Sequence, residues 1–560
     1  MLTGDMLRRS AQRFPKKPAI IFRGPGGRRV VDYAELDAQS NRVAHALIAL
    51  GLPAQAKVSM LARNLPEYGA VFFGAARSGC VLNNVSVLYA PDELAWTLNK
   101  SDTEVLIFDA ALAEKVHAVR ASCPRIRLYV EIGGSAAVAA GASAAPDPAG
   151  RGPSSGSPTE RGPTERGPTE RGPTDLASPG SAATLAWDDF LAGRPDTLPD
   201  MVLDEDAPFC MTYTGGTTGR PKGVLASHRA RAVTAHTVMV EEDIGPRDIV
   251  AIVTPMFHVA ALNIMFQPAM LAGASCVFVT PWSPEAFMQA VEQEGITATF
   301  MVPTQANTLA THPDLDAAKL HSWTKLSFAG APMPDWVQSE LTQRLSGLRL
   351  TQIYGQSEVG VIAALPWYCL PDKLGAVGRQ PYNVDVAVLR PDGSPAAPGE
   401  LGEVASRGEN LMLGYYNEPE QTEAFFRLGK GWGLTGDIGV ADADGFITLV
   451  DRAKDMLISG GENVYPKEIE DAIYQLPEVA ECAVFGIPHE KWGEVPAAYI
   501  LLKPGRSLDE AAVLAQCEAC LARLKRPRLV RFVSSFPKTP IGKIQKNLLK
   551  EPYWQDRKKI

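Results

Sequence analysis

The residues best suited to chemistry lie in one short segment directly after an apolar run. Met211 to Val224 reads Met-Thr-Tyr-Thr-Gly-Gly-Thr-Thr-Gly-Arg-Pro-Lys-Gly-Val, with four glycines, four threonines and one lysine. Glycines let a backbone approach an anion closely, hydroxyls donate hydrogen bonds, and a lysine supplies positive charge. This composition predicts a loop that binds phosphate oxygens, such as those of a nucleoside triphosphate.

The segment differs from a Walker-type phosphate loop, in which a hydroxyl residue directly follows the lysine and binds magnesium. Here Lys222 is followed by Gly223. The sequence therefore excludes the commonest kind of phosphate loop and points to another one.

Further polar side chains follow predicted strands or turns later in the chain. Tyr354-Gly-Gln-Ser-Glu358 comes after a buried strand and ends in a carboxylate, the ligand that a hard cation prefers. Trp432-Gly-Leu-Thr-Gly-Asp437 ends in a second carboxylate, which is an ionised hydrogen-bond acceptor. Near the end of the chain, Lys543 closes a Thr-Pro-Ile-Gly-Lys stretch. Each segment alone is typical of a turn or a solvated charge, so the prediction rests on their combination.

Alternating strands and helices are predicted to position these side chains. Residues 283–295 are predicted to form a helix, because Ser283 suits the N-cap, Pro284 the first turn and Gly295 the end. Repeated strand–helix–strand units indicate an α/β protein with largely parallel sheets. Short buried strands are predicted at 105–109, 248–254, 275–280, 298–303, 326–331 and 350–355.

One stretch interrupts this pattern and is predicted to be a disordered insertion at about 134–183. Arg-Gly-Pro-Thr-Glu begins at Arg161 and again at Arg166, and Arg171 begins a near copy. Between 151 and 180 only two residues other than glycine and proline are apolar. Burial therefore cannot offset the ~1–2 kcal/mol per residue that an ordered backbone costs. A docking role for the charged repeat is the alternative.

The length of 560 residues predicts more than one domain. A turn-rich β region over 385–450 leads to a boundary, and the residues that follow are numerous enough for a small domain. The predicted organisation is an N-terminal domain over 1–451, a hinge over 452–455 and a C-terminal domain over 456–560.

Composition excludes several classes of protein. A hydrophobic content of 46% and a charged content of 21% are typical of a soluble globular protein, and the net charge of -8 argues against a nucleic-acid binder. The chain has no run of about 18 apolar residues to cross a bilayer, and its polar start lacks a secretory signal. Eight scattered cysteines indicate a reducing compartment, so a cytoplasmic location is expected.

Together the motifs resemble those of the AMP-forming adenylating enzymes, which include acyl-CoA synthetases, luciferases and peptide-synthetase adenylation domains. Residues 213–223 are similar to the family's Tyr-Thr-Ser-Gly-Thr-Thr-Gly-x-Pro-Lys-Gly, with Gly215 in place of serine. Residues 354–358 are similar to Tyr-Gly-x-Thr-Glu, and 432–437 to Trp-Phe-x-Thr-Gly-Asp, with Gly433 in place of an aromatic residue. The resemblance covers nearly the whole chain apart from the insertion.

This resemblance implies a fold and a set of residue roles. The N-terminal domain would stack mainly parallel αβ sheets beside a β-rich subdomain, and the C-terminal domain would be small, mobile and α+β. Glu358 would bind the Mg²⁺ ion that bridges ATP phosphates, and Asp437 would accept hydrogen bonds from both ribose hydroxyls. The implied ATP and AMP site consists of Thr214, Gly215, Gly216, Thr217, Thr218, Gly219, Lys222, Gly330, Ala331, Pro332, Tyr354, Gly355, Ser357, Glu358, Asp437, Arg452 and Lys543.

The remaining implied roles concern catalysis and CoA. Gly460 and Gly461 would line the CoA tunnel, and Lys454 would be the hinge about which the C-terminal domain rotates between the two half-reactions. His258 would guard the acyl pocket, with a hydrogen-bonded core histidine as the alternative. The predicted catalytic residues are Lys543, Glu358, Thr214 and His258.

The resemblance predicts an ATP-dependent carboxylate–CoA ligase that forms an acyl-adenylate and transfers the acyl group to CoA. Apolar residues such as Met256, Phe257, Met265, Phe300 and Met301 favour a fatty or other apolar acid. The alternatives are an aryl-acid CoA ligase and a stand-alone adenylating enzyme that loads an acyl carrier protein. An amino-acid-activating domain would need an acidic anchor for the ammonium group, whereas the residues around the candidate pocket are apolar. The expected partners are a small carboxylic acid, ATP and CoA, and a homodimer is left open.

Overall fold

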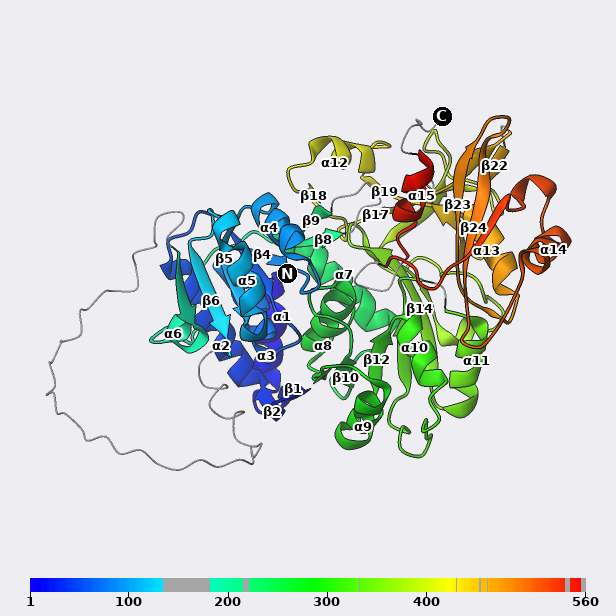
Figure 1. Ribbon diagram of the computed structural model, residues 1–560. Helices are drawn as coiled ribbons and strands as arrows, with labels where there is room; N and C mark the ends of the chain where they lie inside the picture. The colour runs from blue at the N-terminus through cyan, green and yellow to red at the C-terminus, as the bar shows by residue number, and fades with distance from the viewer. Residues whose placement is uncertain are drawn as a thin grey trace, which may run out of the picture.

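The computed structural model describes residues 1–133, 182–214, 221–331, 333–429, 431–452, 455–460, 462–538 and 544–554. Across these ranges the strands form two eight-stranded sheets, a four-stranded sheet and a five-stranded C-terminal sheet. In Figure 1 the blue and cyan elements lie on one side, the green elements in the middle, and the orange C-terminal sheet on the other side. The α/β architecture and the separate C-terminal unit are as predicted.

The first eight-stranded sheet contains the strands that flank the predicted phosphate loop. In order across the sheet, its strands are β18 (Gly414–Tyr415), β9 (Lys222–Ser227), β8 (Pro208–Thr214), β4 (Val81–Asn84), β3 (Lys57–Leu61), β5 (Thr103–Asp109), β6 (Leu128–Ile132) and β7 (Ala183–Ala186). The strands from β8 to β7 pair in parallel, whereas β9 pairs antiparallel with both β8 and β18. Ala183, at the end of the insertion predicted at about 134–183, begins β7, and 134–181 lie outside the described residues.

The second eight-stranded sheet is also mainly parallel and has antiparallel edge strands. In order across the sheet, its strands are β15 (Gly360–Leu365), β14 (Arg349–Gln356), β13 (Lys325–Phe328), β12 (Ala298–Met301), β10 (Ile249–Ile252), β11 (Ser275–Val279), β1 (Pro18–Gly24) and β2 (Gly27–Asp32). The strands predicted at 248–254, 275–280, 298–303, 326–331 and 350–355 are present in this sheet, and the one predicted at 105–109 is β5 of the first sheet. Continuous apolar runs explain why they could be recognised.

A buried aromatic chain connects the two large sheets. Phe209 of β8 contacts Phe72 with ring centroids 5.1 Å apart, and Phe73 contacts Phe266 at 5.9 Å. Phe266 then contacts Phe278 of β11 at 5.9 Å. Every residue of the helix that carries Phe72 and Phe73 is buried, so this helix lies within the core between the sheets.

Helices cover the sheets and fill the space between them. Their bounds are α1 (Thr3–Arg13), α2 (Tyr33–Ala49), α3 (Pro66–Ser78), α4 (Pro91–Lys100), α5 (Ala113–Val119), α6 (Trp187–Leu191), α7 (His228–Glu241), α8 (Gln267–Ala272), α9 (Pro284–Glu294), α10 (Pro303–Ala310), α11 (Asp335–Arg344) and α12 (Pro419–Phe425), with a π-helix at Ala260–Phe266. The helix predicted at 283–295 is confirmed as α9: the Ser283 hydroxyl accepts a hydrogen bond from the Ala286 amide at 3.1 Å, and Gly295 ends the helix at φ 68°.

The predicted β-rich region is a four-stranded antiparallel sheet. Its strands, in order, are β16 (Asp385–Leu389), β17 (Gly402–Arg407), β19 (Trp432–Ala441) and β20 (Ile447–Arg452). β20 ends where the predicted hinge begins, so this sheet leads directly into the C-terminal part of the chain.

The C-terminal part has its own sheet and core. Its elements are β21 (Leu457–Ser459), β22 (Glu462–Val464), α13 (Pro466–Tyr474), β23 (Val479–His489), β24 (Gly493–Leu502), α14 (Glu510–Cys520), β25 (Leu529–Phe532) and α15 (Lys546–Trp554). Strands β21, β22, β23 and β24 pack against α13 and α14 through an apolar cluster of their own. Among the described helices none has the length and apolar character needed to cross a membrane.

Candidate active site

A buried carboxylate lies where the four-stranded sheet meets the second large sheet. Asp437 of β19 is opposite Arg452 of β20, and Arg452 Nε lies 3.1 Å from Asp437 Oδ1. Tyr354 Oη donates to Asp437 Oδ2 at 2.6 Å, and Gln356 Nε2 donates to the same oxygen at 2.8 Å. The structure therefore brings together three residues that the sequence placed in the nucleotide site, with Gln356 added.

The hydrogen bonds of Asp437 limit how it can bind a ribose. A carboxylate offers about four lone-pair positions, and three donors already contact Asp437. The position that remains is on Oδ1, beside the guanidinium of Arg452. One ribose hydroxyl can therefore be accepted without rearrangement, whereas accepting both requires one of the present donors to move.

Tyr354 acts as the donor in this cluster. Burial, and then the nearby Asp437 carboxylate, raise the pKa of the Tyr354 phenol well above its usual range. The phenol thus stays protonated and donates a hydrogen bond to Asp437. Gln356 is fixed by a second contact, since its Nε2 also lies 2.9 Å from the Thr435 carbonyl oxygen.

The predicted metal ligand lies on the turn that follows β14. Glu358 is half-buried, and its backbone oxygen accepts a hydrogen bond from the Met412 amide at 2.8 Å. Tyr415 Oη donates to Glu358 Oε1 at 2.9 Å, so Oε2 is left for another ligand. Burial and the Glu358 carboxylate raise the pKa of Tyr415, so its phenol also remains a donor. Tyr415 was not among the predicted site residues.

The two ends of the phosphate loop are paired strands. Thr214 ends β8 and Lys222 begins β9, and the two residues are opposite each other in the antiparallel ladder. The ammonium group of Lys222 lies 5.0 Å from the centre of the Tyr415 ring. The predicted residues between them, Gly215, Gly216, Thr217, Thr218 and Gly219, lie outside the described residues.

The small residues after β13 are exposed. Gly330 has a φ of 88°, and a Cβ atom built at this position would meet no atom within 4 Å. Ala331 is exposed beside it, so both leave open space at the carboxyl end of the sheet, where α/β proteins bind ligands. Pro332 lies outside the described residues. Ser357 is half-buried directly before Glu358.

Gly355 is required by the close approach of β14 and β15. A Cβ atom at Gly355 would lie 2.0 Å from the Gly360 carbonyl oxygen, which is closer than any real contact. Gly360 itself has a φ of 63°. The chain turns over 357–359, between the end of β14 and the start of β15.

His258 lies two residues before the π-helix at Ala260–Phe266, which packs beside the second sheet. Its Nδ1 accepts a hydrogen bond from the Ala260 amide at 3.2 Å, and its carbonyl oxygen accepts from the Leu262 amide at 3.1 Å. Burial lowers the pKa of its imidazole to about 4, so the ring is neutral near pH 7. These contacts agree with the hydrogen-bonded histidine that was the alternative, and the acyl-pocket role stays a prediction.

The apolar residues proposed for the acyl pocket do not share one surface. Met256, Met265 and Phe300 belong to the main core between the sheets. Met301 lies in a different apolar cluster, together with residues of α9, α10 and α11. Successive residues of a strand point to opposite faces, which explains why Phe300 and Met301 are separated. Met301 is therefore removed from the expected pocket.

The predicted CoA segment forms a tight contact with a tryptophan. Gly460 has a φ of 62°, and its amide donates to the Trp492 carbonyl oxygen at 2.9 Å. A Cβ atom at Gly460 would lie 2.7 Å from the Trp492 ring, so glycine is needed here. Gly461 and the predicted hinge residue Lys454 lie outside the described residues.

The segment that carries Lys543 is fixed at both ends, although 539–543 lie outside the described residues. Lys538 and Ile544 form an antiparallel bridge, and the Gln545 amide donates to the Pro537 carbonyl oxygen at 2.8 Å. Directly after it, Lys546 Nζ lies 2.7 Å from Glu470 Oε1.

Gly433 stands where the family motif has an aromatic residue, and the structure shows what occupies the space. A Cβ atom at Gly433 would lie 2.5 Å from Cε1 of Phe425. Phe425 of α12 therefore packs directly over the glycine, so an aromatic side chain is supplied from another part of the chain.

Comparison with known proteins gives consistent matches over most of the chain. A model described as AMP-binding enzyme matches residues 7–416, and one described as AMP-binding enzyme C-terminal domain matches 468–543. A feruloyl-CoA synthase from Amycolatopsis sp is 33% identical over 521 residues, which are 93% of each chain. A long-chain-fatty-acid–CoA ligase from Mycobacterium tuberculosis is 32% identical over 98% of each chain. The crystal structure of ATP-bound MatB from Rhodopseudomonas palustris aligns with a TM-score of 0.79 at 26% identity, covering 99% of this chain and 100% of that one.

Proposed function

The chain belongs to the AMP-binding enzyme family as an AMP-forming acid–thiol ligase, and we propose that it joins an apolar aryl or aliphatic acid to CoA with ATP. The observation that carries the proposal is that Tyr354 and Gln356 of β14 hold the Asp437 carboxylate, while Glu358 lies on the turn that directly follows this strand. A nucleoside and a metal-bound phosphate chain both need such groups close together.

In the proposed first half-reaction, the acid's carboxylate attacks the α-phosphate of ATP and pyrophosphate leaves. Asp437 and Tyr354 would bind and orient the nucleoside, and Lys222 would bind phosphate oxygens. Catalysis would come mainly from positioning and charge stabilisation. Lys543, from the C-terminal segment, would contact the carboxylate and the α-phosphate as charge develops.

Glu358 fits the predicted Mg²⁺ ion. Mg²⁺ is usually bound through one or two carboxylates together with substrate phosphates, and it would neutralise phosphate charge. In the part of the chain that the structure describes, no three His, Cys, Asp or Glu side chains converge on one point. Glu358 offers a single half-buried carboxylate with Oε2 left open, as this type of site requires.

In the proposed second half-reaction, the CoA thiol attacks the acyl-adenylate and AMP leaves. Gly460 and Gly461 would line the path of the pantetheine chain, and rotation about Lys454 would replace Lys543 with this segment. The close packing of Gly460 on Trp492 supports a fixed shape for this part of the tunnel.

The acid is proposed to be an apolar aryl or aliphatic acid, because relatives named for each kind match the chain. One relative is named for a feruloyl group and another for long-chain fatty acids. A cytoplasmic location fits the eight free cysteines, since thiols persist in reducing compartments. A homodimer remains a prediction that light scattering would check.

The test is pyrophosphate release from Mg-ATP with aryl and short-, medium- and long-chain aliphatic acids, each with and without CoA. The expected result is release with an apolar acid and a thioester that forms only when CoA is present. Pyrophosphate release without formation of a CoA thioester, together with transfer of the acyl group to an acyl carrier protein, would favour the carrier-loading alternative. Release with none of the acids would refute the proposal.

A further inference from the structure

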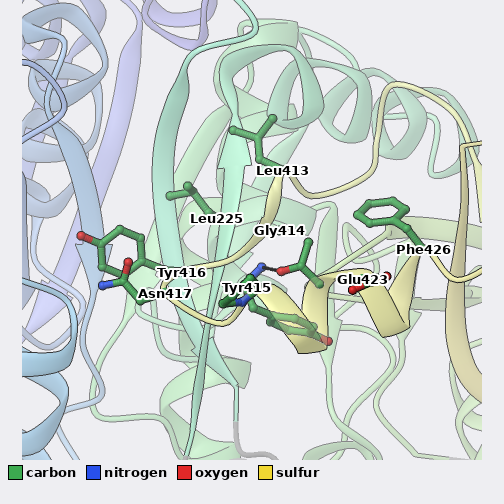
Figure 2. Close-up of a pocket in the computed structure, with 10 residues that line it drawn as sticks. Leu225, Leu413, Gly414, Tyr415, Tyr416, Asn417, Glu423 and Phe426 are labelled. Carbon is green, nitrogen blue, oxygen red and sulfur yellow. Dashed lines mark hydrogen bonds between the residues drawn. The ribbon is translucent and has the colours of Figure 1, made fainter.

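The loop between β17 and α12 presents two adjacent tyrosines to opposite sides. Gly414 pairs with Leu225 and Tyr415 pairs with Val224, so β18 adds a short antiparallel edge to β9. Figure 2 shows Tyr415 and Tyr416 pointing away from each other, as successive residues of a strand do. Tyr415 also lines a surface groove of about 480 Å³.

Tyr415 contacts both the residue assigned to the metal ion, Glu358, and the residue assigned to the phosphates, Lys222. Its hydroxyl donates to Glu358 Oε1 at 2.9 Å, and its ring centre lies 5.0 Å from Lys222 Nζ. Its backbone amide donates to Thr422 Oγ1 at 2.9 Å, and its ring meets Phe425 edge-on with centroids 6.4 Å apart. The tyrosine is therefore held by α12 while it touches one anion and one cation.

Tyr416 anchors the same strand to a different part of the fold. Its hydroxyl donates to Asp102 Oδ2 at 2.8 Å, and Lys57 Nζ lies 4.7 Å from its ring centre. Lys57 begins β3 and Asp102 directly precedes β5, and neither of these two strands carries a predicted site residue. The two tyrosines thus make equivalent kinds of contact, one inside the candidate site and one outside it.

We propose that Tyr415 is a positioning residue for adenylation, which holds the Glu358 carboxylate and the Lys222 ammonium in the arrangement that receives Mg-ATP. Its hydroxyl donates a hydrogen bond to Oε1 and fixes the rotamer of Glu358. Oε2 is therefore already oriented to bind the metal ion, and the side chain does not have to be ordered on binding. Its ring fixes the long Lys222 side chain through a cation–π contact. The inference rests on the proposed function, because that function assigns Glu358 to the metal and Lys222 to phosphate.

The test compares Tyr415→Phe with Tyr416→Phe in the full-length enzyme. Mg²⁺ is titrated at fixed ATP without any acid, and ATP binding is followed by calorimetry and by the ligand-induced rise in Tm. Tyr415→Phe is expected to raise the Mg²⁺ concentration for half-maximal ATP binding about 3- to 10-fold, the cost of ordering one side chain on binding. Tyr416→Phe is expected to lower the Tm of the free enzyme and to leave the Mg²⁺ requirement unchanged.

Comparison of Tyr415→Phe with Tyr415→Leu separates the role of the ring from that of the hydroxyl. Tyr415→Leu removes both groups, so ATP binding should weaken further even at saturating Mg²⁺, because Lys222 loses its aromatic contact. Thr422→Val loosens the backbone of Tyr415 without touching its side chain, and a smaller rise in the Mg²⁺ requirement is expected. This variant keeps the test open if substitution of Tyr415 prevents folding.

Two results would overturn the positioning role. One is a Mg²⁺ requirement for Tyr415→Phe equal to that of the unmodified enzyme. The other is a rise in the Mg²⁺ requirement of Tyr416→Phe as large as that of Tyr415→Phe. Glu358→Gln distinguishes this failure from failure of the proposed function. If Glu358→Gln abolishes Mg²⁺-dependent binding while Tyr415→Phe behaves normally, only the role of Tyr415 is refuted. If Glu358→Gln also behaves normally, the metal assignment itself is wrong.

Discussion

Replacement of Asp437 by asparagine is the sharpest test of the nucleotide site, because the shape of the side chain is kept while its charge is removed. Tyr354 and Gln356 both donate to Oδ2, so the amide oxygen of the new side chain must occupy that position. The amide NH₂ group then replaces Oδ1 and faces Arg452 Nε, which lies 3.1 Å away. Two donors would meet where a carboxylate oxygen now accepts.

The expected effect on ATP follows from the open lone pair on Oδ1. With an NH₂ group in that place, a ribose hydroxyl can no longer donate to a charged acceptor there. A hydrogen bond to a charged group contributes about 1.5–3 kcal/mol, so the Kd for ATP should rise about 10- to 100-fold. Arg452 is a third exposed at its side chain, so water can solvate its guanidinium and the enzyme should remain folded.

The assay is isothermal titration of Mg-ATP into Asp437→Asn in the absence of acid. Asp442→Asn is the matched control, because Asp442 lies on an exposed turn of the same sheet and pairs with Lys373 at 2.8 Å. The control should bind ATP as the unmodified enzyme does. Arg452→Met and the double variant complete a cycle, in which the two effects should be less than additive if Arg452 orients Asp437. An ATP affinity within threefold of the unmodified enzyme would refute the ribose role of Asp437.

Three further predictions concern Lys543, Gly433 and Glu242. Lys543→Ala should slow adenylation about 10²- to 10³-fold and spare thioester formation from supplied acyl-adenylate, whereas an equal loss of both half-reactions would contradict its role. Gly433→Ala should lower the free energy of unfolding by about 1–3 kcal/mol, because its Cβ would lie 2.5 Å from Phe425, and Phe425→Leu should recover part of the lost Tm. Burial raises the pKa of Glu242 from 4.5 to about 8, so the folded state binds a proton that the unfolded state releases, and this group makes stability fall as the pH rises from 4.5 to 8. Glu242→Gln should therefore gain Tm relative to the unmodified protein from pH 6 to pH 8, and a constant difference in Tm would rule this out.

The parts of the fold that could be predicted depend on local signals. The α9 helix could be placed from its cap residues alone, since Ser283 and Gly295 act through bonds within the helix and its first and last turns. The central strands could be placed because strands buried on both faces are continuously apolar. These features need no knowledge of distant contacts, and for this reason a single sequence is sufficient.

The contacts that could not be predicted join segments far apart in the chain. Tyr415 reaches Glu358 only because β18 adds to the edge of β9, and nothing in the residues around 415 signals that pairing. In the same way, the resemblance identified Gly433 as unusual, but the position of Phe425 depends on how α12 packs on β19. Gln356 is different, because strand alternation places it on the same face as Tyr354 and could have indicated its contact with Asp437.

The glycine of the Tyr-Gly-Gln-Ser-Glu motif has a physical reason that the resemblance alone does not give. Tyr354 and Gln356 both point to Asp437, while Glu358, two residues further on, points to Tyr415 instead. Glu358 lies on the turn between β14 and β15, and these strands lie so close together that the backbone at Gly355 meets the Gly360 carbonyl oxygen, in a space that no Cβ atom can share. A larger residue at 355 would push β14 from β15 and move the nucleoside contacts and the metal ligand together. The separation of these two functions within five residues therefore depends on the one position in the motif that has no side chain.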